Sequence, residues 1–299
     1  MNEKLGIPYM GSKRAIAPEI VNFIKKENPK VKYFYDLFGG GGAISFYALN
    51  LFEYVIYNDY NKGVVSLLDK ILTDGITDDF YHWVDMEEFN KLKTGTDWKS
   101  GWIKTCWSFG NNQKNYMYGK KFESNKKLLH DLIVGDLKEK LEKELNVKLR
   151  QAPQNLSVQK RRLWYKKQLA KCGFEHLRQL EHLQRLQHLE RVQQLEQLQH
   201  LERRENLTIK NLSYQDVTIN TPPDETVIYL DPPYKNTAKY EFGICHIEFE
   251  KFVQELKTQG YIVYVSGYHG EYPVVLELNK RQLLATTKTK IVIEKLFKP

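Results

Sequence analysis

The chain has 299 residues, of which 41% are hydrophobic, enough for one large domain or two smaller ones with a proper core. Its N-terminal segment lacks the apolar stretch of a signal peptide, and no apolar run approaches the ~20 residues that span a bilayer, so we expect a cytoplasmic protein without membrane contact. The three cysteines, Cys106, Cys172 and Cys245, lie far apart, which argues against a disulfide framework and against a bound metal.

Charge is distributed unevenly along the chain. The formal net charge is +8, yet residues 99–171 alone carry 18 Lys and Arg against 6 Asp and Glu, a net of +12 that leaves −4 for the rest. A local cationic block favours a polyanionic partner such as phosphate. A solvated lysine-rich surface would explain the same charge about equally well.

The N-terminal part of the chain alternates helices and strands. Hydrophobic periodicity predicts helices over residues 15–26, 43–51 and 63–72, and strands over residues 31–37 and 54–57. A glycine turn, residues 38–42, follows the first strand. A strand, a tight glycine turn, a helix and a second strand in this order predict a βαβ unit.

The middle of the chain loses this pattern and ends in a repeat. Residues 76–175 mix aromatic residues, Gly/Asn-rich turns and basic clusters, which predicts an inserted, mainly helical domain. From residue 177 to residue 201, leucine (once valine) recurs every third position. The filler residues favour a helix, but a spacing of three makes the apolar stripe wind around an α-helix by ~60° per step. The segment must therefore be wrapped by neighbours or depart from regular α-helix.

The α/β pattern returns near the C-terminal end. Strands are predicted over residues 226–230, 261–266 and 290–295, and a helix over residues 249–258. One α/β sheet with helices on both faces is thus divided between the two ends of the chain. The predicted domains are residues 1–75 together with 206–299, the insertion 76–175, and a helical linking segment, 176–205.

Two features of the first half indicate an adenosine-containing cofactor. Glycines after a strand let the backbone turn tightly and approach a ligand closely, and the next helix offers free amides. Asp59 ends the following strand, 20 residues after Gly39, where nucleotide folds place a ribose-binding carboxylate. A plain turn with a helix-capping aspartate is the weaker alternative. These features do not separate NAD from S-adenosylmethionine.

The segment YLDPPY, residues 229–234, separates the two cofactors. It directly follows an apolar strand, and open α/β sheets bind ligands beyond the carboxyl ends of their strands. Pro232 and Pro233 stiffen the loop and lack amide donors, so the Asp231 carboxylate and the Pro232 carbonyl form a corner rich in acceptors. Such a corner suits the amino group of a nucleobase, whose lone pair is delocalised into the ring. The lone pair becomes nucleophilic when the two N–H groups donate hydrogen bonds to these acceptors, and Tyr234 can stack on the face of the base. A structural Pro-Pro turn is the alternative.

These motifs resemble those of the Dam-type DNA adenine-N6 methyltransferases, in which the cofactor motif precedes the recognition domain and DPPY follows it. The resemblance covers roughly residues 5–75 and 205–299. It implies a Rossmann-like methyltransferase sheet, S-adenosyl-L-methionine as cofactor, double-stranded DNA as partner, and methylation of an adenine flipped out of the duplex.

The resemblance also implies roles for individual residues. An aromatic residue and a lysine in YMGSK contact the cofactor, and in NLSYQDV two residues contact its adenine. The implied cofactor-binding residues are Tyr9, Lys13, Phe38, Gly39, Gly40, Gly41, Asp59, Ser213, Tyr214 and Asp231. The implied catalytic residues are Asp231, Pro232, Pro233 and Tyr234.

The target-reading residues are expected in the basic region. The stretch SFGNN, residues 108–112, is similar to the opening of the family's recognition region. The predicted DNA-binding residues are Lys104, Asn111, Asn112, Lys114, Tyr116, Lys120 and Lys121. We expect the protein to act as a monomer or weak dimer.

Three alternatives use the same residues. DNA cytosine-N4 methylation follows the same amine chemistry, but its motif usually has serine where Asp231 stands. A catalytically inactive DNA-binding relative is disfavoured by the intact Tyr9, Lys13, Asp59 and DPPY. A NAD-dependent dehydrogenase would need a nicotinamide site, and DPPY offers nothing for hydride transfer.

Overall fold

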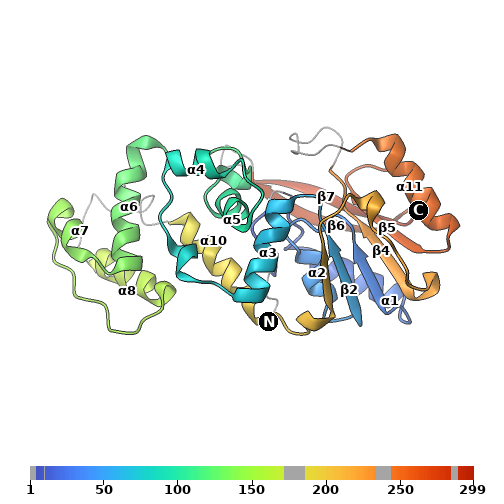
Figure 1. The fold of residues 1–299 in the computed structure, drawn as a ribbon, viewed down its shortest axis with the longest axis horizontal. Helices are drawn as coiled ribbons and strands as arrows, with labels where there is room; N and C mark the ends of the chain where they lie inside the picture. The colour runs from blue at the N-terminus through green and yellow to red at the C-terminus, as the bar shows by residue number, and fades with distance from the viewer. Residues whose placement is uncertain (1–4, 10, 172–185, 234–243, 284–288) are drawn as a thin grey trace.

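The computed structural model describes residues 5–9, 11–171, 186–233, 244–283 and 289–299 (Figure 1). Within them, seven strands form one sheet in the order β3-β2-β1-β4-β5-β7-β6. β1 to β5 are parallel, whereas β7 is antiparallel to both β5 and β6. The strands are β1 (Tyr33–Asp36), β2 (Tyr54–Asn58), β3 (Leu207–Lys210), β4 (Thr226–Leu230), β5 (Ile262–Gly267), β6 (Val274–Leu283) and β7 (Thr289–Phe297).

The N-terminal and C-terminal parts of the chain meet at the centre of the sheet, where β1 lies beside β4. β1 and β4 are neighbours in a register that pairs Tyr33 with Thr226 and Asp36 with Tyr229. From β1 the chain continues through β2 and β3 to one side of the sheet, and from β4 through β5 to the other. The topological switch point of an open sheet is the usual ligand site, and here it lies between these two strands.

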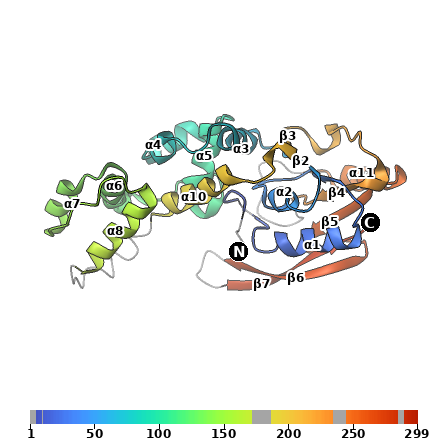
Figure 2. The ribbon, with the colours of Figure 1, turned by 90° about the horizontal axis from the view of Figure 1, so that it is seen from below.

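Helices cover both faces of the sheet, as predicted (Figure 2). α1 (Ala17–Glu27) and α2 (Ala43–Ala48) pack on the face that carries Phe34 and Tyr229. α11 (His246–Thr258) packs on the other face, against Tyr35 and Ile228. Successive strand residues belong to opposite faces, so the strands, buried on both sides, read as continuous apolar runs.

A group of helices beside the sheet shares a core with it. This group contains α3 (Lys62–Asp74), α4 (Met86–Leu92) and α5 (Trp98–Cys106), with the 3₁₀ turns η1 (Asp78–Tyr81) and η2 (Phe109–Asn111). The side chains of Asn61, Asp85 and Asp97 cap the three helices by accepting bonds from backbone amides. The core of this group contains Trp102, Trp107 and Phe80; we call it the α3–α5 core.

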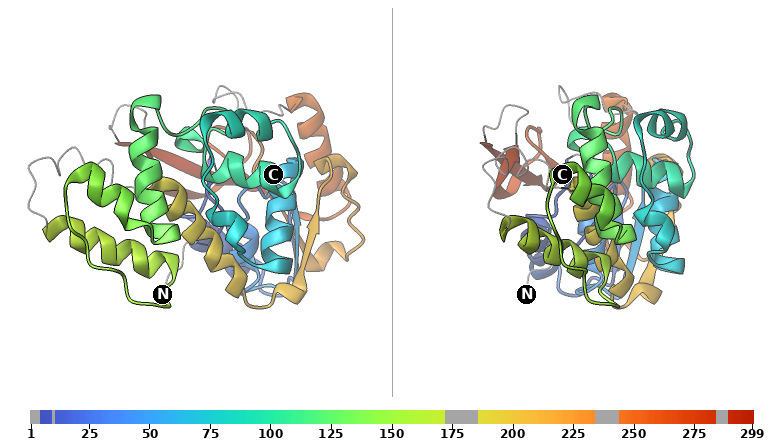
Figure 3. Two further views of the ribbon diagram at one scale, coloured as in Figure 1. Left: turned by 60° about the vertical axis from the view of Figure 1, so that its left-hand side comes forward. Right: turned by 90° about the vertical axis from the view of Figure 1, so that its left-hand side faces the viewer.

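A second helical group extends away from the sheet (Figure 3). It contains α6 (Lys120–Gly135), α7 (Lys138–Leu145) and α8 (Val158–Lys171). Its apolar side chains form a separate cluster around Leu132 and Tyr165, which we call the α6–α8 core. The predicted helical character of the middle region is therefore observed, while residues 76–118 pack with α3, beside the sheet.

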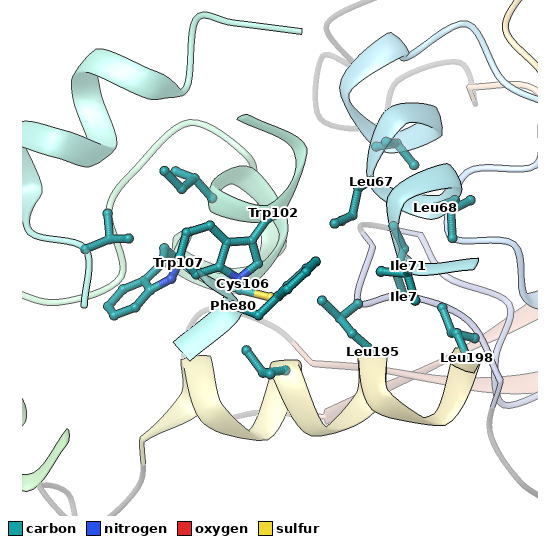
Figure 4. Close-up of a cluster of buried hydrophobic side chains, with 14 of the residues drawn as sticks. Ile7, Leu67, Leu68, Ile71, Phe80, Trp102, Cys106, Trp107, Leu195 and Leu198 are labelled. Atoms are coloured by element: carbon teal, nitrogen blue, oxygen red, sulfur yellow. The ribbon is translucent and has the colours of Figure 1, made fainter. Parts of the chain in front are cut away.

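The leucine repeat joins the two cores. Residues 177–185 of the repeat lie outside the described residues, and the rest forms α10 (Gln187–Glu196) followed by η3 (Gln197–His200). Leu186 and Leu189 belong to the α6–α8 core, whereas Val192, Leu195 and Leu198 belong to the α3–α5 core (Figure 4). The stripe that winds around the helix thus meets one core and then the other. The final 3₁₀ turn has three residues per turn, so the same spacing keeps Leu198 and Leu201 on one side.

Further short turns connect the second half: η4 (Arg204–Asn206), η5 (Tyr214–Asp216) and η6 (Pro223–Glu225). β3 and β6 were not predicted. β3 has only four residues at the sheet edge, and β6 carries Asn, Lys and Arg in the run VVLELNKRQL, so neither shows a strong apolar pattern. None of the helices in the described part of the chain is both long and apolar enough to cross a membrane.

Candidate active site

The predicted N-terminal lysine and the predicted catalytic aspartate meet where β1 and β4 end. Leu37, which follows β1, donates its backbone amide to the Tyr229 carbonyl at 3.2 Å, and Asp231 comes directly after β4. The Nζ atom of Lys13 lies 2.7 Å from Oδ1 and 2.6 Å from Oδ2 of Asp231. Two motifs 218 residues apart in sequence therefore form one site.

Lys13 also contacts a carboxylate that the sequence analysis did not identify. Its side chain is only 5% exposed, and Nζ lies 3.4 Å from Oε1 of Glu294, a 1% exposed residue of β7. Asp231 is more open, at 19%. The buried ammonium group of Lys13 is therefore held in place by ion pairs with two carboxylates. Glu294 belongs to no motif, because it is an isolated acid in a strand that pairs only in the folded sheet.

The glycine turn is built against the N-terminal segment. Gly40 and Gly42 have φ values of 48° and 76°, a left-handed backbone that suits glycine. The Ile7 amide donates to the Gly41 carbonyl at 2.8 Å. A Cβ added at Gly41 would lie 2.7 Å from the Ile7 carbonyl, and one at Gly40 would lie 3.1 Å from the Tyr9 ring. Tyr9 therefore lies against the turn, and a side chain on either glycine would disturb the contact.

Asp59 holds the other side of the turn. One carboxylate oxygen accepts the Gly40 amide at 2.7 Å and the other accepts the Asn61 amide at 2.7 Å. The Tyr57 hydroxyl donates to the Gly40 carbonyl at 2.8 Å. Burial raises the pKa of Asp59, and the two amide bonds oppose that shift. Each carboxylate oxygen retains a second lone pair that a ribose hydroxyl could use.

An aromatic wall adjoins the turn. Tyr214 is buried, with its ring centroid 5.1 Å from that of Phe38, 5.0 Å from Phe252 and 6.0 Å from Phe249. Ser213, beside it, precedes the turn η5. The segment is fixed to the end of β2, because the Leu212 amide donates to the Asn58 side chain at 3.0 Å. Phe38 and Tyr214, both predicted, therefore lie together.

A second fully buried carboxylate, Asp36, stands at the end of β1. It is 1% exposed, and its Oδ2 accepts the Ser45 hydroxyl at 2.7 Å. Burial, together with the nearby charges of Asp231 and Asp59, raises the pKa of Asp36 to about 7. The carboxyl ends of β1, β2 and β4 thus bring together the carboxyl groups of Asp36, Asp59 and Asp231, an arrangement that would favour a cationic ligand.

The rest of the DPPY segment is described only in part. Pro232 is buried and Pro233 is partly buried, whereas Tyr234 lies outside the described residues. The strand that leads into the segment is fixed, since the Tyr229 hydroxyl and the Ser266 hydroxyl are 2.6 Å apart. Within the described part of the chain, no group of three or more His, Cys, Asp and Glu residues could hold a metal ion.

The predicted DNA-binding residues fall into two groups. Lys114, Lys120 and Lys121 are exposed, and Asn111 and Asn112 lie partly buried in the loop after α5. Lys104 differs from this expectation, because it is only 7% exposed and Nζ lies 3.4 Å from the Gly95 carbonyl. Tyr116 is also directed inward: its hydroxyl donates to the Val84 carbonyl at 2.8 Å. Both side chains bond their polar groups to backbone carbonyls of the chain itself.

A comparison with known protein families identifies the family of the chain. The model of a family described as D12 class N6 adenine-specific DNA methyltransferase matches residues 9–98 and 182–291, more than half of the chain. The matched segments contain Tyr9, Lys13, Asp59 and Asp231. No curated protein matches the chain. The chain belongs to the D12 class of N6 adenine-specific DNA methyltransferases.

Proposed function

We propose that this adenine-specific DNA methyltransferase takes its methyl group from S-adenosylmethionine and acts on an adenine that has left the base stack. The observation that carries the proposal is the contact of Lys13 with Asp231 at the end of β4, which pairs with β1, the strand that leads into the Gly39–Gly42 turn. It supports a single site in which a cofactor pocket borders the acceptor-rich DPPY corner.

The pocket fits the chemistry of the cofactor. Glycines at 40 and 41 leave the turn free of side chains, Asp59 offers lone pairs to ribose hydroxyls, and Phe38 with Tyr214 offers an apolar wall for a purine. The carboxylate of Asp231 favours a positive sulfonium. When bound, S-adenosylmethionine would supply an electrophilic methyl group, whose bond to sulfur breaks with the electron pair retained by sulfur.

The chain's own groups activate the acceptor nitrogen. The Asp231 carboxylate and the Pro232 carbonyl each accept a hydrogen bond from one of the two N–H groups of N6. These hydrogen bonds localise the lone pair of the nitrogen, which then forms the bond to the methyl carbon. The nitrogen then loses one proton, through the Asp231 carboxylate to water. Asp231 must exchange the ammonium of Lys13 for the amino group, and Glu294 can retain Lys13 during this exchange.

DNA binding belongs to the basic middle of the chain in this proposal. Residues 76–175 form the recognition domain, residues 1–75 and 206–299 the catalytic domain, and residues 176–205 the segment between them. N6 inside a duplex cannot reach a buried methyl donor, so the adenine must be extruded. Phosphate contacts from exposed lysines such as Lys120 and Lys121 would make binding depend strongly on salt.

Transfer of tritium from labelled cofactor to DNA tests the proposal, with the product identified by nucleoside analysis. We expect N6-methyladenine from the wild-type chain and a loss of turnover of about 100-fold or more in Asp231→Ala, with DNA affinity retained. Asp224→Ala is the matched control, because Asp224 is an exposed aspartate just before β4. Turnover of Asp231→Ala equal to that of this control would refute the catalytic assignment.

A further inference from the structure

The helix α10 is fixed to both helical cores and to α6. Its apolar residues enter the α6–α8 core first and the α3–α5 core afterwards, as described above. In addition, His188 of α10 is buried, with Nδ1 2.8 Å from the Tyr118 hydroxyl and Nε2 2.9 Å from Nδ1 of His130 on α6. A helix held by apolar packing and by polar contacts is a rigid support for the groups that it carries.

Among the side chains that α10 carries, Arg191 forms hydrogen bonds with the end of α5. Its Nη1 atom donates to the carbonyls of Thr105, Cys106 and Ser108 at 3.2, 3.1 and 2.7 Å. The last carbonyls of an α-helix have no partners within the helix and carry a partial negative charge. A guanidinium at this position therefore satisfies them and holds the point where α5 leads into the Ser108–Asn112 loop.

The loop that Arg191 holds has an unusual backbone. Gly110, Asn111 and Gln113 have φ values of 57°, 59° and 60°, and a left-handed backbone is unfavourable for the two residues that are not glycine. Asn61, two residues after Asp59, donates its side-chain amide to the Gln113 side chain at 3.2 Å. A strained loop that is joined to Asn61 needs an external anchor to keep one conformation.

A second polar residue of α10 contacts the residue that follows the YMGSK segment. Gln194 lies one turn after Arg191, and positions three apart share a side of a helix. Its Oε1 accepts the Nη1 of Arg14 at 2.6 Å, and Arg14 follows Lys13 directly in the chain. One side of α10 thus contacts both the target-reading loop and the segment that places Lys13.

We propose that α10 sets the position of the Ser108–Asn112 loop relative to the Lys13–Asp231 site, and that Arg191 is a positioning residue for target recognition. The inference rests on the proposed function, in which this loop reads DNA. It gives the leucine-triplet segment a role: its winding stripe fixes the helix, and its polar side aligns two parts of the site.

The test compares Arg191→Met with Arg204→Met. Methionine keeps the apolar stem of arginine but has no donors. Arg204 is a matched control, because its Nη1 also caps a helix carbonyl, that of Leu72 at 2.7 Å, on the exposed surface away from the loop. Each variant methylates plasmid DNA with labelled S-adenosylmethionine, methylated adenines are mapped by sequencing, and hydrogen exchange of residues 107–118 is measured without DNA. Arg191→Lys serves as the conservative variant.

We expect Arg191→Met to raise KM for DNA and to lower discrimination between adenine sites by about 10-fold. Exchange of the loop amides should rise, cofactor affinity should stay within about twofold of wild type, and Arg191→Lys should restore part of the discrimination. A site map and KM equal to those of Arg204→Met, or unchanged loop exchange, would overturn the inference. If the wild-type chain forms no N6-methyladenine, the proposed function fails, while the exchange comparison still decides whether Arg191 anchors the loop.

Discussion

The buried Asp36 makes a pH-dependent contribution to stability. An aspartate in an unfolded chain ionises near pH 3.9, whereas burial raises the pKa of Asp36 to about 7. The folded chain therefore prefers the neutral carboxyl, and this preference contributes stability that is fully present below about pH 4 and is lost as the pH rises through about 7.

Asp36→Asn should remove this dependence, since an amide keeps the shape of the side chain and does not ionise. At pH 8 the variant is expected to be more stable than the wild type by up to about 4 kcal/mol, at ~1.4 kcal/mol per pKa unit. Denaturant unfolding at pH 5 and pH 8 measures the difference between the two proteins, which isolates Asp36 from other titrating groups. Equal pH dependence of the two proteins would contradict the prediction, and Asp224→Asn controls for an exposed aspartate.

At the scale of single residues, motifs predicted the parts of the site that have local signals. Lys13, the glycine turn, Asp59 and Asp231 each stand in a recognisable local context, and the structure brings them together. Asp36, Glu294 and Arg191 depend on contacts between distant strands and helices. The position of Asp36 at the end of a strand before glycines is the only sequence signal that could have found one of them.

At the scale of elements, α3 and α5 approach closely through two glycines. A Cβ on Gly101 would lie 2.0 Å from the Gly63 carbonyl, whereas a Cβ on Gly63 would meet nothing closer than 3.5 Å. We expect Gly101→Ala to separate the helices and to lower the free energy of unfolding by about 1–3 kcal/mol.

Gly63→Ala provides the control at the same contact. It should be neutral or slightly stabilising, because alanine favours a helix by about 1 kcal/mol over glycine. Denaturant midpoints of the two variants measure the asymmetry. Similar midpoints for both would show that the helices can separate without loss.

Elements with strong periodicity were predicted within a few residues. The strand predicted over residues 54–57 corresponds to β2, and the helix predicted over residues 63–72 corresponds to α3. β3 and β6 were not predicted, because strands at the edge of a sheet bury fewer apolar side chains and therefore show a weaker apolar pattern. The leucine spacing predicted that the apolar stripe winds around the helix. It could not predict which two cores the stripe contacts, because those contacts depend on tertiary packing.

At the scale of the whole molecule, the charge asymmetry should appear in DNA binding. Lys120 and Lys121 begin α6 with exposed side chains. Replacement of both by alanine should reduce the slope of log affinity against log salt concentration by about 2, because each phosphate contact contributes about 0.9.

Fluorescence anisotropy of a labelled duplex across a salt series measures this slope. Replacement of Lys251 and Lys257, both exposed on α11 at the other end of the molecule, is the matched control and should leave the slope unchanged. Equal slopes for the two double variants would place the phosphate contacts elsewhere. Lys104→Ala should also leave the slope unchanged, given the burial of Lys104.

The pairing of β1 with β4 has a consequence for biosynthesis. β2 is made soon after β1, but the other neighbour of β1 leaves the ribosome only after about 190 further residues. At ~5–20 residues per second, this delay lasts roughly 10 to 40 seconds. During that interval Phe34 and Tyr35 of the nascent chain have an open strand edge beside them, while the intervening helices can already collapse. Slow completion of the central sheet is thus a consequence of dividing the sheet between distant parts of the chain.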